Sequence, residues 1–76
     1  MLISQKFIAL KKADLASPGL DADEQKLVEC AYRDEIGPKR KAVRILGQIA
    51  FNANNKGNPV LKQAADDEKL KLNEEI

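Results

Sequence analysis

Hydrophobic residues recur at helical spacing in four segments of this chain of 76 residues. Apolar positions three and four apart form one face of an amphipathic helix, and Gly, Pro and Asn residues separate the segments. The pattern therefore predicts an all-α fold, a small three- or four-helix bundle with connections of ordinary length. We expect one helical domain spanning residues 1–76, with helices over about residues 2–15, 21–36, 38–53 and 59–72.

Residues at the segment boundaries have the conformational preferences of helix ends. Asp21 precedes the second segment and can accept a hydrogen bond from a backbone N–H of its first turn. Gly37 is expected just beyond the end of that helix, and Pro38 in the first position of the next one. The fourth segment begins in a similar way, with Asn58 as the N-cap and Pro59 as the first helical residue.

The third segment has the widest apolar face, which indicates the central helix of the bundle. Ile45 and Phe51 widen its stripe, and Gly47 has no side chain, so a neighbouring helix could approach closely there. The stripe itself consists of Ala42, Val43, Leu46, Ile49, Ala50 and Ala53.

The fourth segment has a thinner apolar stripe, and residues 69–72 alternate between Lys and Leu as a strand does. The sequence leaves open whether residues 66–76 are helical, extended or disordered.

Composition narrows the chemistry that this chain can perform. It contains no histidine and a single cysteine, Cys30, so an internal disulfide and a structural zinc site are both excluded. The sequence also has no nucleophile elbow and no phosphate-binding glycine loop. We therefore expect a protein that is not an enzyme, with no catalytic residues, no metal, no cofactor and no small-molecule substrate.

The same composition predicts where the protein is found. A lone cysteine is typical of a reducing compartment, which favours a cytoplasmic location. No apolar stretch approaches the ~20 residues that a membrane span needs, so we expect no membrane association. The first residues run directly into Gln5 and Lys6, which is unlike a secretory signal peptide.

Charge is distributed unevenly along the chain, although the net charge is only +1. Residues 1–37 contain five basic and seven acidic side chains, and residues 59–76 contain three basic and five acidic ones. Residues 38–58 contain five basic side chains and no acidic one. A basic, acid-free segment therefore lies between two segments that each carry a net charge of −2.

Four of these cations, Lys39, Arg40, Lys41 and Arg44, lie in the first turns of the expected third helix. Cations at that end are unfavourable by ~0.3–1 kcal/mol each, because a helix N-terminus already carries partial positive charge. Such a local cost indicates function, and cations beside free N–H groups form an anion site. We predict that this cluster contacts a nucleic acid or a partner. The same surface is expected to include Gln48, Asn52, Asn55 and Lys56.

An alternative interpretation is that acidic residues neutralise the cluster within the chain. Asp34 and Glu35 precede the cations and could pair with Lys39 or Arg40 across the expected turn. The basic corner would then be a solvated surface and not a binding site.

Two functions are consistent with this sequence. The first is a protein-interaction module, such as an adaptor, an inhibitor or a small subunit, that uses an apolar helix face and the basic start of the third helix. Such a module would bind a protein partner or self-associate. The alternative is a small nucleic-acid-binding regulatory protein that contacts phosphates through the third helix. One form of this alternative is a helix-turn-helix made by the second and third helices. The wide apolar face favours the first function, and the charge asymmetry favours the second.

Overall fold

The computed structural model describes residues 3–14, 19–33 and 35–76. Within these ranges the chain forms no strand and four helices: α1 (Gln5–Ala13), α2 (Ala22–Ala31), α3 (Ile36–Asn55) and α4 (Pro59–Glu75). The predicted all-α bundle is therefore confirmed.

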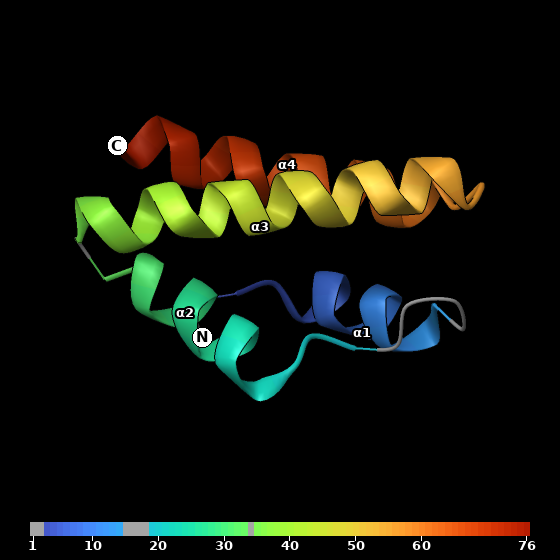
Figure 1. Cartoon of the computed structure of the whole chain (residues 1–76), viewed down its shortest axis with the longest axis horizontal. Coiled ribbons are helices and arrows are strands. Elements are labelled where there is room, and N and C mark those ends of the chain that lie inside the picture. The colour runs from blue at the N-terminus through green and yellow to red at the C-terminus, as the bar shows by residue number, and fades with distance from the viewer. Residues whose placement is uncertain (1–2, 15–18, 34) are drawn as a thin grey trace.

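The two long helices, α3 and α4, lie antiparallel and form a helical hairpin (Figure 1). The short helices α1 and α2 lie together on one side of this hairpin, where α1 packs against α4 and α2 packs against α3. α3 and α4 thus each contact two helices, so the number of neighbours does not single out α3 as the central element. The opposite side of the hairpin is not covered by α1 or α2 (Figure 1).

The core between these layers is mostly aliphatic. Alanines on the facing sides of α3 and α4, such as Ala50 and Ala65, are buried and allow the two helices to pack closely. The predicted stripe of the third helix is buried except for Val43, which is half-buried against the core. Burial of such side chains is the main favourable contribution to the stability of a bundle. The largest fully buried side chains are Ile3, Phe7, Val28, Leu46, Leu61 and Leu72.

The boundary between the second and third helices differs from the predicted one. α2 ends at Ala31 and not at residue 36, and α3 begins at Ile36 and not at residue 38. Gly37 therefore lies in the first turn of α3, and Pro38 is its third residue. The reason is that the first N–H groups of a helix have no acceptor within it, so proline is tolerated throughout the first turn.

The predicted caps of α2 and α4 are confirmed. The Asp21 carboxylate accepts a hydrogen bond of 2.8 Å from the backbone N–H of Glu24. The Asn58 side chain accepts one of 3.1 Å from the backbone N–H of Leu61. Pro59 directly follows this cap as the first helical residue, where its missing N–H leaves no hydrogen bond unmade.

α1 is shorter than predicted, and α4 is longer. The side chain of Ser4 accepts from the N–H of Phe7, which begins α1 at residue 5 and not at residue 2. α1 ends at residue 13; residue 15, its predicted end, lies outside the described residues. α4 continues to Glu75 and includes the alternating residues 69–72. No helix in the described part of the chain is both long enough and apolar enough to cross a bilayer.

Candidate functional site

Arg40, Lys41 and Arg44 are exposed on the outer face of α3. Arg40 and Arg44 are four residues apart and therefore lie one above the other, with Lys41 beside them. α3 contains no acidic residue, and none of the three cations forms an ion pair with another described residue. The buried stripe of α3 occupies the opposite face and fixes these side chains toward solvent.

Lys39 does not belong to this exposed group. Its side chain is only 6% exposed, and its ammonium lies 3.6 Å from a carboxylate oxygen of Glu75 at the end of α4. Lys39 is seven residues from Leu46, two full turns, and so shares the buried face of α3. The predicted four-cation cluster is thus divided. Three cations face solvent, and the fourth, Lys39, is buried and pairs with the half-exposed Glu75 of the same chain.

A cation from α4 joins the exposed ones. A Cβ added to Gly47 would meet Cδ and Nζ of Lys69 at 3.9 Å, so the Lys69 side chain lies over this glycine. Gly47 is one turn from Arg44, which places the Lys69 ammonium beside the cations of α3. The expected role of Gly47 was wrong, because its open position receives a lysine side chain and not a closely packed helix. We call the exposed side chains of Arg40, Lys41, Arg44 and Lys69 the basic face.

Phe51 extends this surface with an aromatic ring. It was expected to widen the buried stripe, but its side chain is 60% exposed. Phe51 lies seven residues beyond Arg44 and therefore projects from the same side of α3, two turns further along. The rise of 1.5 Å per residue separates the two positions by about 10 Å along the helix axis. An exposed aromatic ring thus continues the row of cations.

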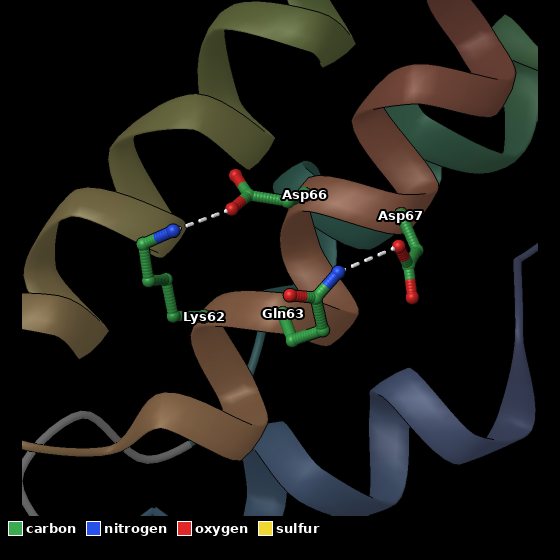
Figure 2. A network of polar contacts seen from close by, with 4 residues as sticks. All are labelled: Lys62, Gln63, Asp66 and Asp67. Atoms are coloured by element: carbon green, nitrogen blue, oxygen red, sulfur yellow. Dashed lines mark hydrogen bonds and ion pairs between the residues drawn. The ribbon is translucent and has the colours of Figure 1, made fainter.

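Two acidic side chains of α4, Asp66 and Asp67, line a groove with Lys69 and are engaged within α4 itself. Figure 2 shows Lys62 paired with Asp66 at 2.8 Å, and the Gln63 amide donating to Asp67 at 3.0 Å. Both pairs join residues four apart, the spacing at which side chains on a helix meet. The charge of Asp66 is therefore balanced locally by Lys62, and less negative charge is left to oppose the basic face.

The predicted polar contacts are more dispersed. Gln48 donates a hydrogen bond of 3.1 Å to Asn52, and both line a groove of about 370 Å³ with Asp21 and Glu24 of the α2 N-terminus. The nearby carboxylates make this edge of α3 a poor site for phosphate. Asn55 and Lys56 are exposed at the far end of α3, and Lys56 is its C-cap, about 24 Å along the axis from Arg40.

The predicted local neutralisation involved Asp34 and Glu35. Asp34 lies outside the described residues. Glu35 is the N-cap of α3, is exposed and makes no side-chain capping hydrogen bond. Among the residues that the structure describes, Glu35 forms no ion pair with a cation of the cluster. The carboxylate that pairs with Lys39 comes from Glu75, 36 residues further along the chain.

A second polar cluster lies on the inner side of the hairpin. The hydroxyl of Tyr32, which caps the C-terminus of α2, donates a hydrogen bond to the buried carboxylate of Glu68 in α4. Burial, this hydrogen bond and the negative charges of Glu68 and Glu75 raise the pKa of Tyr32 above its ordinary value. The hydroxyl is thus held protonated as a donor, which is a structural role. A general acid at neutral pH would need the opposite shift.

Neither metal-binding geometry nor a known relative assigns a function to these surfaces. In the described ranges, no three Cys, Asp or Glu side chains are placed to hold a metal ion. No protein-family model, no curated protein and no solved structure matches this chain.

Proposed function

We propose that this protein is a non-catalytic nucleic-acid-binding module whose contact surface is the basic face. The observation that carries the proposal is the row of three exposed cations on an acid-free helix, extended by Lys69 from α4. Phosphate contacts by Lys and Arg provide most of the non-specific affinity of proteins for nucleic acids. A regular phosphodiester backbone supplies the repeated negative charges that such a row requires.

The division of the predicted cluster supports this proposal over simple charge compensation. Lys39 has an internal partner in Glu75, whereas Arg40, Lys41 and Arg44 form no ion pair with another described residue. Because α3 begins at Ile36, these three cations lie beyond its first turn, and the expected cost from the helix dipole falls mainly on Lys39. Arg40 and Arg44 are like charges four residues apart, which lowers helix stability by about 0.2–0.5 kcal/mol. An anionic ligand would remove this cost. A binding role in the cytoplasm also fits the lone cysteine, Cys30.

A protein partner or self-association is the second candidate function. The observation that favours it is the exposure of Val60 and Leu70 on α4 and of Ile76 directly after it, each more than two-fifths exposed. Val60 also lines a groove of about 430 Å³ between α1 and α4. The wide apolar stripe of α3 gives this candidate no support, because the stripe is used within the bundle itself.

Salt-dependent binding tests the first candidate. Fluorescence anisotropy with a labelled duplex and a labelled single strand is measured across a salt series. Four phosphate contacts predict a slope of log affinity against log salt of about −3.6 on duplex and about −2.8 on single strand. The variant with Gln at Arg40, Lys41, Arg44 and Lys69 should lose this binding.

The matched control replaces four exposed lysines away from the basic face, Lys6, Lys12, Lys26 and Lys71, with Gln. Its net charge equals that of the first variant, so the two proteins differ in the position of the lost charge. Equal loss of affinity in both variants would show a general charge effect and contradict the proposed surface. Absence of binding at low salt would contradict the function itself. In that case sedimentation and a search for protein partners would test the second candidate.

A further inference from the structure

We infer that the basic face, if the proposed function holds, is built for single-stranded nucleic acid, with Phe51 as the platform on which a base stacks. The inference rests on the position of an exposed aromatic ring in line with exposed cations. Base–aromatic stacking together with backbone-tracking cations is the usual way in which proteins bind single strands.

The width of the hairpin argues against insertion into a duplex groove. α3 and α4 pack side by side along their lengths (Figure 1). Two helices with axes 8–10 Å apart, each 10–12 Å across, are together roughly 20 Å wide. The major groove is about 12 Å wide and admits one helix. Because α2 and α4 both pack against α3, the hairpin as a whole is wider than the groove, and the basic face is better placed to lie along a phosphate backbone.

The spacing along α3 suits an unpaired strand. About 10 Å separates Arg44 from Phe51 along the axis, and the Lys69 ammonium lies between them over Gly47. Stacked nucleotides repeat every 3.4 Å in one strand, so this interval spans about three nucleotides, or fewer when the strand is extended. A base turned out of such a strand can reach the Phe51 ring while its neighbouring phosphates meet Arg44 and Lys69. Paired bases inside a duplex cannot make this contact.

The exposed ring of Phe51 is available for contact with a ligand, because 60% of this side chain is accessible. Transfer of an aromatic side chain from water to an apolar environment is favourable, and alanines nearby show that small residues are accepted on α3. A ring on the outer face contributes little to this core. Leu70 on α4 is exposed to a similar extent, 57%, but lies outside the row of cations and provides a matched control.

The test compares an oligo-dT strand, an abasic strand of equal length and a duplex of equal length, all at low salt. We expect oligo-dT to bind about five- to a hundredfold more tightly than the abasic strand, the range of one stacked base. Phe51→Ala should remove this difference and leave the salt slope unchanged. Leu70→Ala should retain it. Duplex affinity should be insensitive to both substitutions.

Phe51→Trp gives a direct spectroscopic reading, because the chain contains no other tryptophan. Its fluorescence should be quenched by oligo-dT and not by the abasic strand. Equal affinity for the two strands, or unchanged oligo-dT affinity in Phe51→Ala, would overturn the stacking role. If salt-dependent binding persisted in those cases, the proposed function would still stand. Absence of binding to all three probes would overturn the proposed function and this inference together.

Discussion

The hydroxyl of Tyr32, the C-cap of α2, donates a hydrogen bond to the Glu68 carboxylate in α4, across 36 residues of sequence. The bond joins one of the short helices to the hairpin through the interior of the bundle. Glu68 is only 4% exposed, so Tyr32 supplies a hydrogen bond that water cannot easily replace.

Removal of this donor should destabilise the protein. Tyr32→Phe keeps the ring but leaves a buried carboxylate oxygen without its partner, which costs about 1–3 kcal/mol. Glu68→Gln keeps an acceptor for the hydroxyl, so we expect a smaller loss. Urea unfolding monitored by circular dichroism measures both variants. Equal stability of Tyr32→Phe and the unchanged protein would show that this hydrogen bond contributes nothing to folding.

The raised pKa of Tyr32 predicts a loss of stability at alkaline pH. In the unfolded chain tyrosine ionises near pH 10, whereas in the folded protein the hydroxyl keeps its proton to higher pH. Above about pH 10 the unfolded state therefore binds fewer protons, and the free energy of unfolding falls as pH rises. This contribution is fully present below pH 10. Urea titrations at several alkaline pH values should show a steeper decline for the unchanged protein than for Tyr32→Phe.

The absorbance of the phenolate provides an independent check, because Tyr32 is the single tyrosine and tryptophan is absent. The folded protein should titrate at higher pH than the urea-unfolded chain. Coincident titration curves would contradict the raised pKa.

The open position of Gly47 predicts a stabilising substitution. A methyl group there would be in ordinary van der Waals contact with the Lys69 side chain, and glycine within a helix costs roughly 0.5–1 kcal/mol relative to alanine. Gly47→Ala should therefore raise the free energy of unfolding by about that amount. Gly57 is the contrasting control. Its φ of +73° is in the left-handed region, so Gly57→Ala should destabilise the protein by about 1 kcal/mol. A loss of stability in Gly47→Ala would indicate a tighter α3–α4 contact.

The caps of α2 and α3 predict losses of stability of different size for the same type of substitution. Asp21 accepts a 2.8 Å hydrogen bond from Glu24, so Asp21→Ala should cost about 1 kcal/mol. Glu35 occupies the equivalent position in α3 without a capping hydrogen bond, so Glu35→Ala should change stability by less than about 0.5 kcal/mol. Thermal unfolding of the two variants measures the difference. A larger loss in Glu35→Ala would contradict this assignment of caps.

The four helices could be predicted because their signals are local and repeated. The stripe that includes Ala42, Leu46 and Ala53 has helical spacing over three turns, so no other regular structure fits it. The start of α3 was predicted less well, because Pro38 satisfies the requirements of any position in the first turn. The side chain of Asn58 specifies its cap more directly, and that boundary was predicted correctly.

Prediction of the candidate site required both the helical spacing of residues along α3 and the register of α4 against α3. Lys39 and Phe51 were assigned to the wrong faces, although their spacings from Leu46 and Arg44 contain the correct answer. Their residue types indicated the opposite faces, because lysine is usually found at the surface and phenylalanine in the core. Lys69 could not have been found in this way. Its place over Gly47 depends on the antiparallel register of α4 against α3, which no local pattern specifies.

The pairing of Lys39 with Glu75 predicts that this lysine can be replaced without harm to the fold. Removing one partner of a buried ion pair leaves an uncompensated charge, whereas an apolar residue in place of a buried cation is often neutral or stabilising. Glu75→Gln should therefore destabilise the protein by about 1 kcal/mol, because Lys39 stays buried while Glu75 is half-exposed. Lys39→Met should be neutral or stabilising. Glu74→Gln, at an exposed neighbouring position, should have no effect.

Substitution of Lys39 also tests whether nucleic-acid affinity depends on the orientation of the cations on α3 or only on net charge. Lys39→Met and Arg40→Met remove one positive charge each from adjacent residues. Because Lys39 cannot reach a phosphate, its substitution should leave affinity for nucleic acid and the salt slope nearly unchanged. Arg40→Met should reduce the slope by about 0.9 on duplex, the share of one phosphate contact. Equal changes in both variants would mean that net charge governs binding, and that the orientation of side chains on α3 does not.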